Sequence, residues 1–193
     1  LSLQHDAILV VDEAHATGVF GADGRGLAAA LAPRENIITL HTCGKALGAE
    51  GALLCGPGVV RDFLINRGRG FIFSTAPSPF MAAMVRAGLA VLQERGDLRI
   101  ALWDRIRLAE ARLAVAGVPA SGSQILPCII GEDAQTMGMA IALQNQGFDV
   151  RGIRPPTVPA GTSRLRISIT NNVDKAEIEA LATALAELKM VAA

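Results

Sequence analysis

The sequence predicts an α/β protein in which a mainly parallel sheet is followed by a smaller α+β domain. Two short apolar runs, residues 8–11 (ILVV) and residues 37–40 (IITL), have the length and composition of strands buried on both faces. Each run leads into polar residues, as at the carboxyl edge of an open α/β sheet, where ligands bind. Beyond residue 96 the pattern changes to short strands and amphipathic helices. We therefore assign residues 1–96 to the large domain and residues 97–193 to a small C-terminal domain.

The composition is that of an ordinary globular protein with a sizeable core. Of 193 residues, 51% are hydrophobic, and 18 Lys and Arg balance 18 Asp and Glu, so nothing favours nucleic acid or an anionic membrane as a partner. Three cysteines without CxxC spacing suit free thiols in the cytoplasm and predict neither a disulfide framework nor a metal site. No apolar run approaches the roughly 18 residues of a membrane helix, and Arg86 interrupts the nearest candidate.

The elements of the first domain follow from its apolar runs and their breakers. The first strand leads into a loop punctuated by glycines (Gly18, Gly21, Gly24 and Gly26). A short helix, the second strand and a lysine loop come next. Residues 52–55 indicate another buried strand, residues 59–66 a helix, and residues 79–93 a long helix. Because a core strand comes almost at once, we expect this chain to be the C-terminal part of a longer enzyme.

In the second domain, Asp97 and Asp133 are expected to cap helices that run to about Gly117 and to Gly147. Strands are expected over residues 124–130, 150–153 and 164–169, with a proline-rich turn before the last one. The final helix carries a single apolar stripe at three- and four-residue spacing, made of Ile178, Leu181, Leu185 and Leu188.

The polar residues after the two apolar runs carry the chemistry. Asp12 and His15 follow the first run, and Lys45 follows the second in a loop too apolar for an ordinary solvated lysine. Gly44 before it would let the backbone bend tightly. An acid and a lysine at one sheet edge suit pyridoxal phosphate, because the lysine forms a Schiff base and the acid partners the ring nitrogen. Taken alone, Asp12 and His15 also fit a strand-end cap and a hydrogen-bonded structural histidine.

The same Asp-Glu-Ala-His segment has a second reading, the magnesium-binding box of a helicase-like NTPase. That reading requires a GxxxxGK[ST] loop on an earlier strand. Here Gly44 and Lys45 are followed by Ala46, which offers no hydroxyl to Mg²⁺, and they lie after the acidic box. The NTPase therefore stays only as a remote alternative.

Hydroxyl groups near these loops are candidates for binding phosphate. Thr42 lies three residues before Lys45, and Ser74 with Thr75 ends a short apolar run. Each could direct a hydroxyl at a phosphate, although each is also an ordinary loop residue. His5 and His41 are expected to be structural.

Arginines of the second domain are candidates for binding a carboxylate. Arg164 and Arg166 are two apart on one expected strand, so they share a face and could hold a carboxylate by bidentate hydrogen bonds. An exposed strand face explains either arginine alone equally well. Arg154, beside the proline turn, is a third candidate.

Four segments match one known pattern: residues 12–18 (DEAHATG), 21–26 (GADGRG), 42–48 (TCGKALG) and 73–75 (FST). Together they resemble the α-oxoamine synthases, pyridoxal-phosphate enzymes of the aspartate aminotransferase fold (fold type I). The resemblance extends over essentially the whole chain. It implies a homodimer with shared active sites and residues 1–96 as the C-terminal part of the cofactor-binding domain.

The resemblance also implies roles toward the cofactor. Lys45 would hold pyridoxal 5'-phosphate and act as the base at the substrate α-carbon. Asp12 would pair with the pyridinium N–H, and His15 with the phenolic oxygen. Thr42 would contact the phosphate, as would two residues acting in the neighbouring subunit, Ser74 and Thr75.

On the substrate side, the resemblance implies that Thr157 touches substrate and that Arg166, with Arg164 beside it, holds the amino-acid carboxylate. Segment 153–162 (IRPPTVPAGT) is most similar to the biotin-pathway branch, which condenses L-alanine with a pimeloyl thioester of CoA or a carrier protein and releases CO₂. Sister enzymes that use glycine or serine are the alternative. Glu50 departs from the pattern, where small or hydroxyl residues are commoner.

Overall fold

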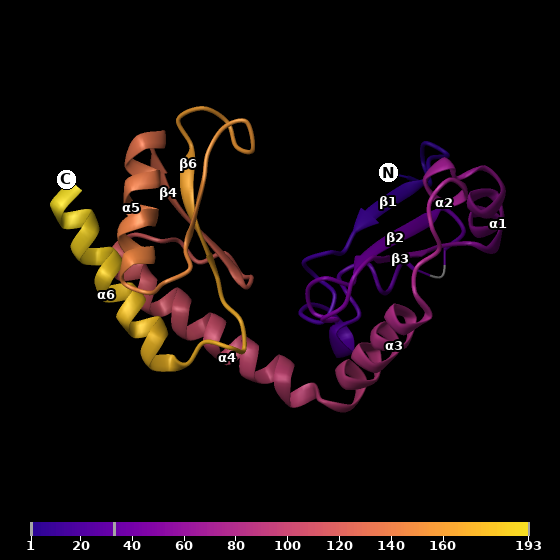
Figure 1. Ribbon diagram of the computed structural model, residues 1–193, viewed down its shortest axis with the longest axis horizontal. Helices are drawn as coiled ribbons and strands as arrows, with labels where there is room; N and C mark the ends of the chain where they lie inside the picture. The colour runs from indigo at the N-terminus through magenta and orange to yellow at the C-terminus, as the bar shows by residue number, and fades with distance from the viewer. Residues whose placement is uncertain (1, 33, 193) are drawn as a thin grey trace. The chain divides into compact units, whose positions relative to one another are not determined.

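A computed structural model of the chain describes residues 2–32 and 34–192. The described chain divides into two compact units that meet between Arg99 and Ile100, and each has its own three-stranded sheet (Figure 1). The division falls inside helix α4 (Gly96–Leu113), whereas the sequence pattern placed it just before Asp97. Asp97 does not act as the expected cap, because it lies inside this helix and its carboxylate accepts hydrogen bonds from Arg95 at 2.8 and 2.9 Å.

The first unit is built on strands β1 (Leu9–Asp12), β2 (Ile37–Thr42) and β3 (Ala52–Cys55), in that order across the sheet. β1 and β2 are parallel and β2 and β3 antiparallel. A short 3-10 turn, η1 (Ala22–Gly24), lies in the glycine loop, and three helices follow: α1 (Gly58–Arg67), α2 (Arg69–Ile72) and α3 (Pro79–Glu94). The parallel pairing predicted for the first two strands is confirmed.

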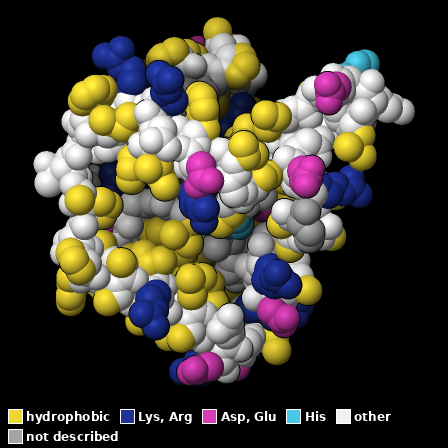
Figure 2. All heavy atoms as spheres, turned by 90° about the vertical axis from the view of Figure 1, so that its right-hand side faces the viewer, with side chains coloured by type: hydrophobic (Ala, Val, Ile, Leu, Met, Phe, Trp, Pro, Cys, Tyr) yellow, Lys and Arg dark blue, Asp and Glu magenta, His cyan; other side chains and the backbone are white. Residues whose placement is uncertain are grey.

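The burial expected of these strands is only partly found. In the central strand β2, Ile37 and Thr39 are buried, but Val10 in β1 is 61% exposed and Leu54 in β3 is 48% exposed. Both outer strands pair on one side only within the described sheet. Figure 2 shows hydrophobic side chains exposed over much of the face that this unit presents, which agrees with exposed side chains in and around α1 and α2 (Val59, Phe63, Phe71 and Phe73).

The glycine loop differs from the expectation in one detail. The short helix expected after it is a series of turns in the described residues, with the amides of Leu31 and Ala32 both donating to the carbonyl of Ala28. The segment is short, and Pro33 in the sequence cannot donate a helical hydrogen bond. Instead the loop closes on the preceding residues, where the amide of Gly18 donates to the carbonyl of Gly24 at 2.7 Å.

The second unit is an antiparallel sheet packed with helices. Its strands are β4 (Ile125–Gly131), β5 (Arg151–Ile153) and β6 (Ser163–Ser168), in the order β4-β6-β5. Its helical elements besides α4 are η2 (Ala114–Ala116), α5 (Asp133–Asn145) and α6 (Lys175–Ala192), with α5 and α6 on one side of the sheet (Figure 1). The predicted stripe of α6 is confirmed, because Ile178, Leu181 and Leu185 are buried in the core and Leu188 packs against it.

Asp133 does not cap α5 as expected. The N-cap residue is Glu132, which makes no capping hydrogen bond with its side chain, and the Asp133 carboxylate accepts a hydrogen bond from the Ser163 hydroxyl at 2.5 Å. That contact ties the start of α5 to the start of β6. None of the helices in the described part of the chain combines the length and hydropathy needed to cross a bilayer.

Candidate active site

Strand pairing brings the acidic segment and the lysine loop to one edge of the first sheet. Asp12 ends β1 and lies opposite Leu40 in β2. Because side chains alternate along a strand, Asp12, Leu40 and Thr42 belong to one face of the sheet. Lys45 follows three residues later, and its Nζ donates to the Thr42 hydroxyl at 3.4 Å. The sheet edge predicted from sequence therefore carries an acid, a hydroxyl and an amine.

The lysine loop is a compact turn whose geometry was partly mispredicted. The amide of Gly48 donates to the carbonyl of Lys45 at 3.1 Å, and the amide of Ala49 donates to the carbonyl of Cys43 at 2.9 Å. Positive φ angles occur at Gly48 (+62°) and Gly51 (+84°), not at Gly44. The tight bend therefore comes after the lysine, where only glycine adopts the left-handed conformation freely.

Close packing fixes this loop against the rest of the first unit. Cys43 and Leu47 are buried together with Val85 of α3. A Cβ added at Gly88 of α3 would lie 2.7 Å from the carbonyl oxygen of Leu47. Such a contact leaves no space for any side chain at this helix position, so the helix backbone lies directly against the loop that carries the lysine.

The acidic segment packs against the same loop. Gly18 has φ +78°, and a Cβ added there would lie 2.6 Å from the Cβ of Ala46, the neighbour of Lys45. The segments that carry Asp12 and Lys45 are thus held together at the strand ladder and again beyond its end.

The side chains of Asp12 and Lys45 are both exposed. One oxygen of Asp12 accepts the amide hydrogen of Ala14 at 2.8 Å, which orients the carboxylate. Among the described residues Lys45 forms no ion pair. The apolar surroundings expected for the lysine are not found, because its loop buries Cys43 and Leu47 and turns Lys45 outward. An amine and a carboxylate are therefore open to a ligand.

The remaining candidates of the first unit lie on exposed segments. His15 is exposed three residues after Asp12. Ser74 and Thr75 are exposed between α2 and α3, and the Ser74 hydroxyl donates to the carbonyl of Gly70 at 2.7 Å. Ser74 is therefore engaged locally, and contact with a phosphate would require its hydroxyl to turn.

In the second unit, the alternation predicted for the arginine strand is confirmed. Leu165 and Ile167 of β6 are buried, whereas Arg164 and Arg166 on the other face are half-buried. The Arg164 guanidinium donates to the carbonyl and hydroxyl oxygens of Thr162 at 3.0 and 3.1 Å. Arg166 is paired across the sheet with Arg151 of β5, so two guanidinium groups start from directly opposed positions.

The proline turn before this strand carries Thr157. Its side chain is exposed, and its amide donates to the carbonyl of Arg154 at 3.1 Å. The peptide bond between Pro155 and Pro156 is cis. Thr157 is thus presented to solvent by a hydrogen-bonded turn.

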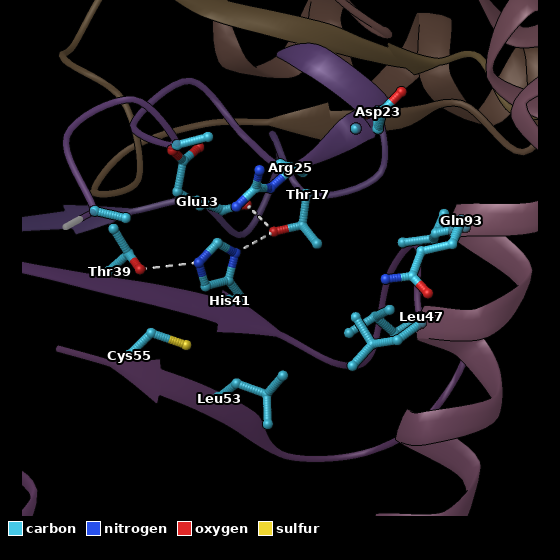
Figure 3. A pocket seen from close by; sticks show the side chains of 15 residues that line it. Glu13, Thr17, Asp23, Arg25, Thr39, His41, Leu47, Leu53, Cys55 and Gln93 are labelled. Atoms are coloured by element: carbon cyan, nitrogen blue, oxygen red, sulfur yellow. Dashed lines mark hydrogen bonds between the residues drawn. The ribbon is translucent and has the colours of Figure 1, made fainter.

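The first unit contains a pocket of about 670 Å³ that was not predicted from the sequence (Figure 3). Its wall combines polar side chains with leucines of the lysine loop, β3 and α3. The lining residues include Glu13, Thr17, Arg25, Thr39, His41, Leu47, Leu53, Leu89 and Leu92. His41 and Thr39 alternate with Thr42 along β2, so they belong to the opposite face of the sheet. The alternation of side chains along this strand is the sequence signal that could have predicted His41 and Thr39 on this face.

Glu13 is the buried hub beside the candidate site. It is 1% exposed, and its carboxylate accepts the amide hydrogens of Leu27, at 3.1 Å, and Ala28. A Cβ at Gly26 would lie 2.8 Å from the Glu13 carboxyl carbon, so the glycine loop wraps closely around this group. The Glu13 carboxylate is therefore engaged in holding the glycine loop.

Comparison with known proteins adds a family and named relatives. The sequence pattern of the family "Aminotransferase class I and II" matches residues 1–185. A putative 8-amino-7-oxononanoate synthase of Desulforudis audaxviator is 43% identical over 187 residues, which cover 96% of this chain and 49% of that protein. The 8-amino-7-oxononanoate synthase of Anaeromyxobacter dehalogenans is 42% identical over 96% of this chain and 47% of its own length. The chain thus spans about half the length of these curated relatives.

Solved structures give a consistent picture of the fold. Serine palmitoyltransferase of Sphingomonas wittichii aligns with a TM-score of 0.88 at 26% identity, over 98% of this chain and 49% of its own. The 8-amino-7-oxononanoate synthase of Francisella tularensis aligns with a TM-score of 0.83 at 25% identity, over 96% of this chain and 56% of its own. A structure of SPT with a PLP internal aldimine aligns with a TM-score of 0.88 at 26% identity, over 98% of this chain and 49% of its own.

Proposed function

Because the chain belongs to the aminotransferase class I and II family, whose fold it has and whose cofactor is pyridoxal phosphate, we propose that the whole protein is an α-oxoamine synthase. It would join an amino acid to an acyl thioester with release of CO₂. The observation that carries the proposal is the sheet edge of the first unit. There the Lys45 amine contacts Thr42, and Asp12 lies on the same face as Thr42.

The donor groups of the first unit fit pyridoxal phosphate. Lys45 offers a primary amine for the aldehyde, and Asp12 a negative charge for the ring nitrogen. When bound, the cofactor supplies an electron-withdrawing ring that stabilises negative charge at the amino-acid α-carbon. In this proposal His15 donates to the phenolic oxygen, and Thr42 binds the phosphate.

The chain's own residues would then handle the proton transfers. Asp12, oriented by the amide of Ala14 at 2.8 Å, would keep a proton on the ring nitrogen. The Lys45 amine would remove the proton from the α-carbon of the substrate. Thr42, at 3.4 Å from Nζ, keeps the amine near the place where it is needed.

The active site would be shared by two protomers. We propose a homodimer in which Ser74 and Thr75 of one protomer reach the phosphate bound by the other. Their exposure on the segment between α2 and α3 supports this role.

We propose L-alanine and a pimeloyl thioester as the substrates, which gives 8-amino-7-oxononanoate, the product in the names of relatives about 40% identical to this chain. Arg166, with Arg164 beside it, would hold the amino-acid carboxylate, and Thr157 would contact the substrate. A sister enzyme that uses serine or glycine is the second candidate, which the structural similarity to serine palmitoyltransferase favours.

The cofactor assignment is tested on the purified whole protein incubated with pyridoxal phosphate. We expect a yellow protein whose cofactor becomes covalently attached to Lys45 after borohydride treatment. The first unit has no other lysine, and Lys45→Arg should abolish the adduct. An adduct on Lys175 or Lys189, or none in folded protein, would contradict the proposal.

The substrate assignment is tested by measuring kcat/KM with alanine, glycine and serine against pimeloyl, succinyl, acetyl and palmitoyl thioesters. We expect alanine with the pimeloyl thioester to be preferred. Arg166→Ala should weaken transition-state binding, as measured by kcat/KM, by about 2–5 kcal/mol if the carboxylate is held in a bidentate contact. A clear preference for another pair would transfer the protein to the sister enzymes and leave the cofactor chemistry in place.

A further inference from the structure

His41 is held between two threonine hydroxyls (Figure 3). Its Nδ1 lies 2.8 Å from the Oγ1 of Thr17, and its Nε2 lies 2.9 Å from the Oγ1 of Thr39. Thr17 belongs to the segment after Asp12 and His15, whereas Thr39 belongs to β2. The imidazole therefore joins the acidic segment to the strand that leads to Lys45.

The partners of the Thr17 hydroxyl indicate which ring nitrogen of His41 carries a proton. The Thr17 hydroxyl has one hydrogen, which it donates to the carbonyl of Glu13 at 2.9 Å. With that hydrogen on the Glu13 carbonyl, the Thr17 hydroxyl accepts from His41, which favours the tautomer with the proton on Nδ1. In that tautomer Nε2 is the acceptor, and the Thr39 hydroxyl donates to it. The chain of donors runs from Thr39 through His41 and Thr17 to the Glu13 carbonyl.

This series of side-chain hydrogen bonds lies where the strand ladder ends. The last ladder bond from the acidic segment is donated by the amide of Glu13 to the carbonyl of Leu40 at 2.8 Å. Beyond it β2 continues to pair with β3, with His41 opposite Leu53, while residues 13–17 form turns. Side-chain hydrogen bonds through His41 thus continue the connection past the main-chain ladder.

We propose that His41, as a neutral imidazole protonated on Nδ1, is a positioning residue that keeps the segment of Asp12 and His15 in place against the segment of Thr42 and Lys45. It touches neither cofactor nor substrate, and it acts through Thr17. This inference rests on the proposed function only in assuming that the two segments hold pyridoxal phosphate.

The tautomer can be measured without the cofactor. In the whole protein labelled with ¹⁵N-histidine, we expect the His41 ring to show a protonated Nδ1 and an unprotonated Nε2. The signal is assigned by its loss in the His41→Asn variant. A proton on Nε2, or rapid averaging between the two tautomers, would overturn the inference.

The positioning role is measured as affinity for pyridoxal phosphate by absorbance titration. His41→Leu should weaken binding roughly two- to tenfold, the range of one or two hydrogen bonds. His41→Asn keeps a donor near the Nδ1 position and should recover most of the affinity, whereas His41→Gln should not. His5→Leu, at an exposed position, is the matched control and should bind as wild type does. Equal losses for the Asn and Leu variants would contradict the directional chain.

The energetic coupling between Thr17 and His41 tests this inference independently of the proposed function. The denaturant stability of Thr17→Val, His41→Leu and the double variant should be non-additive, because both substitutions break one chain of bonds. Additive effects would overturn the inference. A wild-type protein that fails to bind pyridoxal phosphate would sink the proposed function, while the tautomer and the stability coupling would still decide the role of His41.

Discussion

Glu13 shows how one buried charge organises the candidate site. Its carboxylate accepts two amides of the glycine loop, and its carbonyl accepts hydrogen bonds from Ala16, Thr17 and the Thr17 hydroxyl, all at 2.9 Å. The adjacent Asp12 is exposed and oriented by a single amide. Two neighbouring acids thus have different tasks, one holding the loop and one facing a ligand.

Glu13→Gln should destabilise the protein by about 1–3 kcal/mol, because the new amide group would face a backbone N–H that has lost its acceptor. Denaturant unfolding measures this loss. Glu35→Gln, at an exposed position in the same unit, should change stability by less than about 0.5 kcal/mol. A Glu13→Gln variant as stable as this control would show that the two amide bonds contribute nothing.

Cys128 should make the free energy of unfolding depend on pH in the alkaline range. Burial raises the pKa of its thiol above the ordinary value, and nearby Lys189 acts weakly in the opposite direction. As pH rises past the ordinary thiol pKa, the unfolded chain loses the proton that the folded chain keeps, so stability falls. Between pH 7 and pH 10 the wild type should lose more stability than Cys128→Ala. The exposed Cys55 is the control, and Cys55→Ala should follow the wild type.

At the scale of elements, α3 and the lysine loop act as one piece. The Gly88 backbone lies against the Leu47 carbonyl, and the buried side chains of Val85, Cys43 and Leu47 pack around it. Any movement of α3 would therefore move the loop that carries Lys45.

Gly88→Ala tests this contact. In an open helix, Gly→Ala stabilises by about 0.5–1 kcal/mol, but here the methyl group would meet a backbone oxygen at 2.7 Å and should destabilise by about 1–3 kcal/mol. Gly138→Ala in α5 is the matched control, because no atom lies within 4 Å of its added Cβ, and it should be neutral or stabilising. Thermal unfolding of both variants gives the comparison, and a stabilised Gly88→Ala would mean that the loop yields easily.

Periodicity predicted most elements, because apolar spacing reports which face a strand or helix buries. It located both parallel strands, the stripe of α6 and the shared face of Arg164 and Arg166. It failed where a polar residue has several available partners. Asp97 pairs with its near neighbour Arg95 in place of capping. Asp133 pairs with Ser163, and a local pattern holds no information about a partner 30 residues away. The bend was predicted before Lys45 and lies after it, because the sequence does not show which glycine of the loop adopts a positive φ angle.

The candidate site could be predicted only in part. The sheet edge was predictable, because the end of a β-strand and the polar residues that follow it are local features of the sequence. The link from His41 to Thr17 was not, since it joins residues 24 apart through side chains whose directions depend on the fold. The exposure of Lys45 was also missed, because the apolar neighbours that seemed to surround it are turned into the core.

At the scale of the whole molecule, the two units have separate cores. The core of the second unit centres on fully buried side chains of α4, β4, β6 and α6, such as Ile106, Leu126, Leu165 and Leu185, whereas the first unit has the cluster at the lysine loop. A cavity in one core should therefore first loosen its own unit, because the buried cluster that loses packing belongs to that unit.

Leu185→Ala tests this separation in the whole protein. The side chain is completely buried, so its truncation should cost about 2–5 kcal/mol. Hydrogen exchange should accelerate in β4, β6 and α6, while the amides of β2 and of the lysine loop keep their protection and the protein still binds pyridoxal phosphate. Met190→Ala on the same helix is the control, because that side chain is 73% exposed and its loss should change exchange very little. Equal acceleration in both units would mean that they unfold as a single cooperative body.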